Sequence, residues 1–201
     1  MCWPRWPCDR KTKLNKQVEV SSGNARFIAW MVVALVIVIA DQVTKWAIVE
    51  WVPLYDRVPI NSFVNLTHQK NSGAAFSFLA NAGGWQRWFF VVLASAVSVV
   101  IAVWIWRIRR EGQAILSIGL AFVLGGAVGN LVDRVRLGHV TDFIQVWFGN
   151  WAFPSFNVAD AGITVGAALL IIDALFFSGR EKAAVEAEAG SNGGPDSGNQ
   201  T

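Results

Sequence analysis

Two aspartates, Asp142 in GHVTDFIQV and Asp160 in FPSFNVADAGITVG, lie beside stretches of markedly apolar sequence. An ionisable group at the edge of hydrocarbon is energetically costly, so its presence indicates a functional site. Two carboxylates held close together cannot both ionise cheaply and therefore share one proton. The charged carboxylate can then accept a proton from water while the neutral one donates to a peptide carbonyl. This chemistry hydrolyses a peptide bond without a covalent intermediate.

Other chemistries find less support among the residues. The only histidines are His68 and His139, and no HExxH motif is present, so we predict neither a catalytic metal nor a cofactor. A Ser–Lys pair is a minor alternative, because nothing in the sequence would desolvate one lysine selectively. Its candidate members are Lys45, Lys70, Ser72 and Ser77.

The acidic residues also have structural interpretations. Asp160 follows Asn157 just before an apolar run, so it could stabilise the start of a helix through the helix dipole. Asp142 could be a solvated strand residue. Asp133 stands next to Arg134 at the end of another apolar run, which predicts an ion pair at the membrane interface. Position alone does not decide between these interpretations and the catalytic one.

The composition indicates a membrane protein. Only 15% of the residues are charged and 54% are hydrophobic, whereas soluble domains carry about 25% charged residues. Eleven tryptophans cluster near the ends of apolar runs, as expected for rings at headgroup level. Each run is close to the ~20 residues that a helix needs to cross hydrocarbon. We predict four spans, at about 27–49, 86–106, 112–132 and 159–179.

Lysine and arginine positions predict the orientation. Basic residues concentrate in the N-terminal tail (1–25), in the connection near residues 107–110 and at the start of the C-terminal tail (180–201), which are therefore expected in the cytoplasm. The connections at about 50–85 and 133–158 then lie outside. Their turn residues and alternation predict short strands and loops. The expected fold class is an α-helical integral membrane protein with four transmembrane helices (domain 26–179) and a small extracytoplasmic β-strand and loop subdomain.

The tails and the charge distribution add little about partners. No basic patch interleaved with aromatic residues is apparent, so nucleic acid is not an expected partner. Cys2 and Cys8 both lie in the N-terminal tail, where we expect them to be reduced and incidental. The C-terminal tail ends in GSNGGPDSGNQT and is expected to be disordered.

Five motifs, in order along these runs, resemble the lipoprotein signal peptidases of bacteria, also called signal peptidase II. They are DQVTKW at 41–46, NSGAAFSFL at 71–79, GGAVGNLVDR at 125–134, VTDF at 140–143 and FNVADAGITVG at 156–166. The resemblance covers about residues 27–178, and GGWQRWFF at 83–90 is similar to proteobacterial members. Together the motifs are far more specific than any one of them.

The resemblance implies a globomycin-sensitive aspartyl endopeptidase of the bacterial inner membrane, with its active site at the periplasmic face. Such an enzyme removes the signal peptide of prolipoproteins just before a diacylglyceryl-modified cysteine. Its expected partners are these prolipoproteins and membrane lipids, and we expect a monomer. The resemblance places Asp142 and Asp160 on the catalytic pair. The residues that match positions lining the family's substrate and inhibitor site are Asn71, Asn130, Arg134 and Asn157. The residues that match supporting positions are Asp41, Lys45 and Asp133.

Two other classes compete with this interpretation. A small proton-coupled transporter would also carry aspartates in its membrane domain, but it should place them at mid-membrane rather than at one face. A non-enzymatic membrane scaffold would explain the glycines of GGAVGN as helix-packing residues. It would not explain why three asparagines and two aspartates are expected on the same side.

Overall fold

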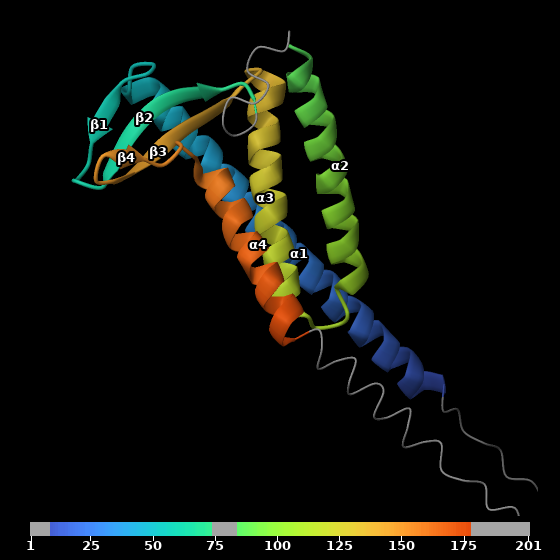
Figure 1. Ribbon diagram of the computed structural model, residues 1–201. Coiled ribbons are helices and arrows are strands. Elements are labelled where there is room, and N and C mark those ends of the chain that lie inside the picture. The colour runs from blue at the N-terminus through green and yellow to red at the C-terminus, as the bar shows by residue number, and fades with distance from the viewer. Residues whose placement is uncertain (1–8, 74–83, 178–201) are drawn as a thin grey trace, which may run out of the picture.

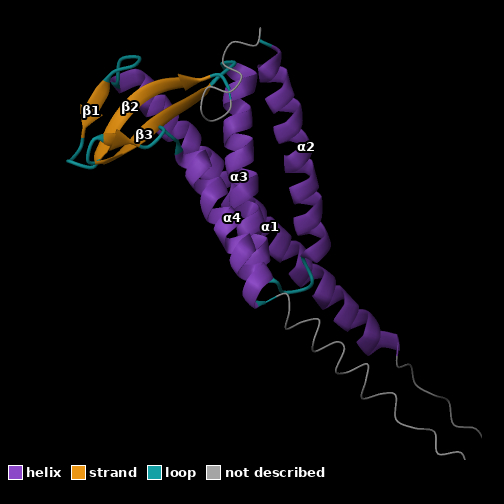
Figure 2. Ribbon diagram, in the orientation of Figure 1, coloured by secondary structure: helices purple, strands orange, loops and turns teal. Residues whose placement is uncertain are grey.

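The computed structural model describes residues 9–73 and 84–177, and side chains from Ser22 onwards. Within these residues the chain forms a bundle of four helices and a small sheet (Figures 1 and 2). The strands lie in two pairs along the sequence, one between α1 and α2 and one between α3 and α4. The elements are α1 (Asp9–Trp51), β1 (Arg57–Pro59), β2 (Val64–Asn71), α2 (Trp85–Ile108), α3 (Ala114–Arg136), β3 (Val140–Phe148), β4 (Trp151–Ala152) and α4 (Val158–Phe176).

Four helices are long and apolar enough to cross a membrane, which confirms the predicted fold class. Their spans are Ser22–Trp51, Trp85–Ile108, Ala114–Arg136 and Val158–Phe176. Apolar side chains on their outer surfaces are exposed, as hydrocarbon-facing residues should be; examples are Leu35, Val92 and Ile171. The first helix also extends back to Asp9, well into the polar segment expected as a tail.

Helix ends follow local sequence. Pro53 stands just after the end of α1, and proline cannot continue the helical hydrogen-bond ladder. Gly84 precedes α2 with φ 91°, and Gly112 turns the chain between α2 and α3 with φ 74°. Both angles are in the left-handed region, which glycine adopts without steric cost.

Helix α3 is the centre of the bundle. Half of its most apolar window is buried, compared with 11–17% for the corresponding windows of the other helices. Glycines allow α4 to approach it closely: a Cβ on Gly126 would lie 2.3 Å from the carbonyl oxygen of Ala159, and one on Gly166 would lie 2.7 Å from that of Gly119. The expected packing role of the glycine motif is therefore confirmed.

The sheet is antiparallel, in the order β1-β2-β3-β4. It lies at one end of the bundle, beyond the C-terminal end of α1 (Figure 1). Ile48 of α1 and Val52, just after that helix, pack with Phe143 of β3 and attach the sheet to the bundle. Gln69 pairs with Asp142 and Asn71 with Val140, so the last residues of β2 run beside the first residues of β3. This register places polar residues of both strands above the ends of α3 and α4.

Candidate active site

Asp142 lies in strand β3 and is buried. Its exposed fraction is 4%, so it is not a solvated strand residue. Asn71 Nδ2 donates to Asp142 Oδ2 over 2.9 Å, and Asn157 Nδ2 donates to Asp142 Oδ1 over 2.7 Å. Both carboxylate oxygens therefore have an amide donor, one from β2 and one from the start of α4.

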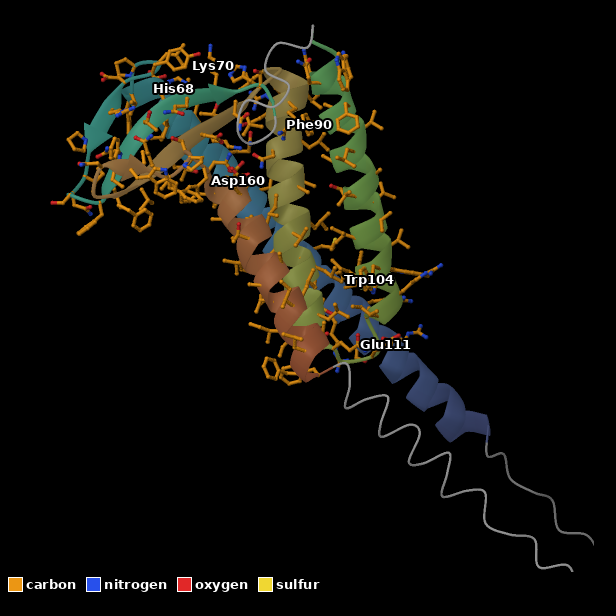
Figure 3. All side chains as sticks on the ribbon, in the orientation of Figure 1. His68, Lys70, Phe90, Trp104, Glu111 and Asp160 are labelled. Atoms are coloured by element: carbon orange, nitrogen blue, oxygen red, sulfur yellow. The ribbon has the colours of Figure 1, made fainter. Side chains whose placement is uncertain are left out.

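Asp160 lies in the first turn of α4, where Asn157 is the N-cap (Figure 3). The Asp160 N–H donates to Asn157 Oδ1 over 2.9 Å, and the Asn157 N–H donates to Asp160 Oδ2 over 3.4 Å, which forms a capping box. The expected helix-start role is thus confirmed. It does not exclude chemistry, because Asp160 Oδ1 faces a different partner, Asn130.

Two buried amides connect the aspartates. Asn130 Nδ2 donates to Asp160 Oδ1 over 2.7 Å, and Asn130 Oδ1 accepts from Asn157 Nδ2 over 3.2 Å. Asn157, which is fully buried, also donates to Asp142. The path Asp142–Asn157–Asn130–Asp160 therefore holds the two carboxyl groups in a fixed relation.

Burial raises the pKa of Asp142 from 3.8 to about 6. This value is a net effect: the negative charge of Asp160 also raises the pKa, while the hydrogen bonds from Asn71 and Asn157 and the positive charge of Lys45 lower it. The negative charge of Asp160 thus favours the protonated form of Asp142. Asp142 can accordingly carry a proton at a pH where an exposed aspartate is ionised.

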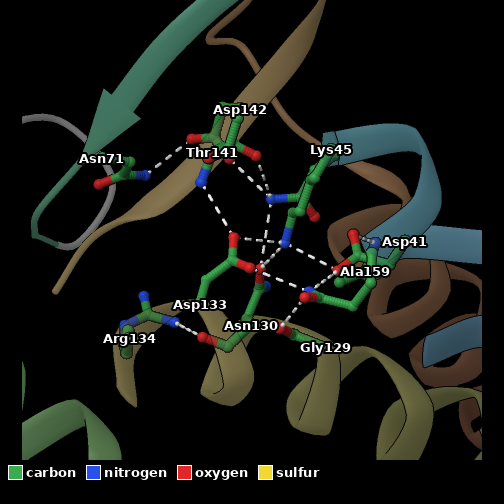
Figure 4. A network of polar contacts seen from close by, with 12 residues as sticks. Asp41, Lys45, Asn71, Gly129, Asn130, Asp133, Arg134, Thr141, Asp142 and Ala159 are labelled. Carbon is green, nitrogen blue, oxygen red and sulfur yellow. Dashed lines mark hydrogen bonds and ion pairs between the residues drawn. The ribbon is translucent and has the colours of Figure 1, made fainter. Parts of the chain in front are cut away.

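A buried ion triad of Lys45, Asp41 and Asp133 contacts Asn130 (Figure 4). Lys45 Nζ lies 2.8 Å from Asp41 Oδ2 and 3.0 Å from Asp133 Oδ2, and it donates to Asn130 Oδ1 over 3.1 Å. All three residues of the triad are less than 5% exposed. Three acceptors match the three N–H donors of an ammonium group. This geometry does not suit the neutral lysine that a Ser–Lys mechanism would need.

The two carboxylates of the triad also bind segments that carry the aspartate pair. Asp41 Oδ1 accepts from the Ala159 N–H over 2.9 Å, at the first turn of α4. Asp133 Oδ2 accepts from the Thr141 N–H over 3.1 Å, next to Asp142 in β3. The triad thus connects α1 and α3 to both the segment that carries Asp160 and the strand that carries Asp142.

Gln42 was missed in the sequence analysis. Its Nε2 lies 2.9 Å from Asp133 Oδ1, 3.2 Å from Asp41 Oδ2 and 3.2 Å from the Gly129 carbonyl oxygen. The signal that could have identified it is its place in DQVTKW, between the two charged residues of the motif.

The expected ion pair between Asp133 and Arg134 is wrong, because Asp133 pairs with Lys45 instead. Adjacent residues on a helix point about 100° apart, and Asp133 faces α1. Arg134 Nη1 donates to the Asn130 carbonyl over 3.3 Å, and its guanidinium lies 5.0 Å from the ring centroid of Phe90. Its positive charge interacts favourably with Asp160 and Asp142.

A second arginine fixes the end of α3. Arg87 of α2 donates through Nε to the Arg134 carbonyl over 2.9 Å and through Nη2 to the Val135 carbonyl over 2.7 Å. These carbonyls lie in the last turn of the helix, where few backbone N–H groups remain to bind them. The Arg134 carbonyl also accepts from the Gly138 N–H over 3.2 Å. Arg87 therefore attaches α2 to the part of α3 that carries Arg134, a role not predicted from the sequence.

All nine expected site residues lie within the described chain, and they converge at the sheet-side end of the bundle. The motif NSGAAFSFL begins in the described chain with Asn71, Ser72 and Gly73, and its remainder lies outside the described residues. In the described residues, no three His, Cys, Asp or Glu side chains are grouped so as to hold a metal ion.

Comparisons with known proteins agree on one family. The family described as Signal peptidase (SPase) II matches residues 33–176. The lipoprotein signal peptidase of Ectopseudomonas mendocina is 50% identical over 148 residues, which cover 73% of this chain and 87% of that protein. The lipoprotein signal peptidase of Cupriavidus pinatubonensis is 49% identical over 166 residues, which cover 83% and 93%.

Two solved structures of bacterial membrane enzymes share the fold. They superpose with TM-scores of 0.63 and 0.62 at 29% sequence identity. The first match covers 73% of this chain and 87% of the other, and the second covers 75% and 94%. Sequence and structure thus agree, and the chain belongs to the signal peptidase II family.

Proposed function

We propose that this protein is an aspartic endopeptidase of the bacterial inner membrane that removes signal peptides from prolipoproteins. The observation that carries the proposal is the pair Asp142 and Asp160, whose carboxyl groups are joined through Asn157 and Asn130. Relatives named lipoprotein signal peptidase supply the substrate class. No comparison favours the proton-coupled transporter that the sequence also allowed.

The surroundings of the two carboxyl groups favour different roles. Burial raises the pKa of Asp142, so Asp142 is assigned the proton that the pair shares. Asp160 lies at the N-terminus of α4, where the helix dipole stabilises a negative charge. Asp160 is therefore assigned the role of general base.

In the first step, water gives a proton to Asp160 while its oxygen adds to the scissile carbonyl carbon. The carbonyl oxygen takes the proton of Asp142, which leaves a neutral diol, an ionised Asp142 and a protonated Asp160. In the second step the C–N bond breaks, the departing amine takes the proton of Asp160, and the diol returns a proton to Asp142. The pair ends in its starting state. Because water is the nucleophile, no covalent bond forms between the enzyme and the substrate.

The polar neighbours are proposed to hold the substrate and the pair. Asn71 ends β2 beside Asp142, and Arg134 keeps most of its guanidinium donors free of the hydrogen bonds described above. Both can bind backbone carbonyls of an extended peptide. Asp41, Lys45 and Asp133 act indirectly, because they position the first turn of α4 and the start of β3.

The location of the site suits a substrate anchored in the membrane. Asp160 lies at the end of the bundle next to the sheet (Figure 3), and Asp142 lies in strand β3 of that sheet. The helices of the bundle have apolar outer surfaces. An apolar signal helix and diacylglyceryl chains can remain in hydrocarbon while the peptide bond reaches this end. The basic residues near 107–110 belong to the opposite end, so the proposed topology places the site on the periplasmic face and both termini in the cytoplasm.

The test is a cleavage assay with purified protein in detergent. The substrates are a diacylglyceryl-modified prolipoprotein and the same precursor without the lipid. We expect a mobility shift of the modified precursor alone, and a product whose mass begins at the modified cysteine. Equal cleavage of both precursors would contradict the proposed lipid dependence, and cleavage of neither would contradict the proposed function.

A further inference from the structure

A second feature lies at the end of the bundle opposite the aspartate pair. A pocket of about 230 Å³ is formed where the start of the α1 span, the end of α2 and the start of α3 meet. Its walls include Arg26, Trp30, Ile108, Arg109, Gln113 and Ser117. We propose that this pocket binds the phosphate group of an anionic phospholipid headgroup.

The charge of the pocket favours an anion. Arg26 comes from α1 and Arg109 follows α2, so two arginines from different elements line one cavity. Among the described residues, the ion pairs are those that Lys45 makes with Asp41 and Asp133. Neither arginine is therefore paired with a carboxylate in that part of the chain. Guanidinium groups bind phosphate oxygens through paired N–H donors.

Arg109 is held in place before any ligand arrives. Its Nε donates to Asn24 Oδ1 over 3.3 Å, and its Nη1 donates to the Trp106 carbonyl. Its guanidinium also lies 4.1 Å from the centroid of the Trp106 ring. These contacts do not use Nη2. A guanidinium that is already ordered loses less conformational entropy when it binds a ligand.

The position of the pocket at the ends of two membrane spans favours a lipid over a soluble phosphate. Arg26 lies in the first turns of the Ser22–Trp51 span, and Arg109 comes directly after the Trp85–Ile108 span, so both lie where headgroups are expected. Trp30 and Ile108 give the cavity apolar walls that glycerol and acyl carbons can contact. Basic pockets between membrane helices are typical sites for anionic headgroups.

The start of α3 adds backbone N–H donors to the wall of the pocket. Gln113 is the N-cap of this helix, and both Gln113 and Ala114 line the pocket. The first N–H groups of a helix lack intrahelical acceptors and carry the positive end of the dipole. They complement the two arginines.

Native mass spectrometry of the purified full chain in detergent tests the proposal. Dioleoylphosphatidylglycerol is titrated against dioleoylphosphatidylcholine, and inorganic phosphate is added in a separate arm. We expect phosphatidylglycerol to bind preferentially. Arg26→Gln and Arg109→Gln should each weaken it about tenfold, the size expected for loss of a charge-assisted contact. Arg107→Gln is the matched control, because Arg107 is exposed at the same end and does not line the pocket.

Equal weakening by all three substitutions, or by none, would overturn the site, as would equal binding of the two lipids. Displacement of the lipid by millimolar phosphate would overturn the lipid assignment. Ala114→Phe fills the rim without changing charge, and it should weaken binding as well. Unfolding temperatures without added lipid identify any variant that is simply misfolded. Because no prolipoprotein is present, a negative result here leaves the proposed peptidase activity untouched.

Discussion

Asn157 Nδ2 donates to Asp142 Oδ1 over 2.7 Å, and the same Asn157 is the N-cap of the helix that carries Asp160. One side chain therefore sets both the start of α4 and the position of Asp142. Its full burial means that water cannot replace these bonds without rearrangement. The geometry of the pair is thus coupled to the geometry of a helix end.

Substitutions of Asn157 should separate these two roles. Serine caps helices about as well as asparagine but is too short to keep the bond to Asp142, whereas alanine loses the cap too, at a cost of about 1 kcal/mol. We expect Asn157→Ser and Asn157→Ala both to lose at least roughly tenfold in turnover, since one charge-assisted bond is removed. Only the alanine variant should also lose the cap contribution to thermal stability. Full turnover in Asn157→Ser would contradict a positioning role.

The pH dependence of kcat/KM should report the pair. The pKa of Asp142 is raised to about 6, so Asp142 holds its proton at lower pH and loses it as pH rises through that value. If Asp142 donates to the carbonyl, kcat/KM should fall on the alkaline side with an apparent pKa near or above 6. Asn71 donates to the ionised form and lowers the pKa of Asp142, so Asn71→Ala should move the alkaline limb to higher pH. A shift to lower pH would contradict the assignment.

The same pKa has a consequence for stability. A carboxyl group whose pKa is raised by folding binds more protons in the folded than in the unfolded chain between pH 3.8 and about 6. Its contribution to stability is therefore complete below pH 3.8 and lost as pH rises through about 6. Asp142→Asn lacks this titration. As pH rises from 3.8 to about 6, its unfolding temperature in detergent should therefore fall less than that of the unchanged protein. Parallel curves would contradict the raised pKa.

The buried triad predicts that replacing Lys45 destabilises the protein far more than replacing the exposed Lys70. Lys45→Met leaves Asp41 and Asp133 as neighbouring buried carboxylates without a counter-ion, which should cost about 3–5 kcal/mol. Lys70→Met is the control, because Lys70 is exposed on β2 and the same substitution there should be nearly neutral. Thermal unfolding in detergent measures both.

A double variant checks the cause. Lys45→Met combined with Asp41→Asn removes the positive and one negative charge together, so it should recover part of the loss. A double variant as unstable as the sum of its single variants would show that the charges of the triad are not coupled.

Much of the architecture follows from local sequence. Gaps between charges located the spans to within a few residues, because crossing hydrocarbon requires uninterrupted apolar sequence. The helical extension of α1 to Asp9 could not be read in this way, since its residues are polar and hydropathy carries no signal there. Side-by-side glycines predicted close helix approach, and Gly126 against Ala159 shows it.

The site was only partly predictable, because its contacts join segments far apart in the chain. Asp133 was matched with its neighbour Arg134, whereas its partner Lys45 comes from another helix. Asp160 was given two competing interpretations, a helix cap and a catalytic group. The two are compatible, since one oxygen closes the capping box and the other accepts from Asn130. The prediction of which two aspartates form the pair depended on the family motifs rather than on composition.

The most direct test of the account is turnover of a diacylglyceryl-modified prolipoprotein by Asp142→Asn and Asp160→Asn, each purified and shown to be folded. Loss of a proton-transfer group should lower kcat by roughly 10²–10⁴-fold, while Asp56→Asn, at an exposed position in the loop before β1, should retain full turnover. The account predicts near-complete loss in both site variants with unfolding temperatures above the assay temperature. Substantial turnover by either folded variant would contradict the shared-proton pair.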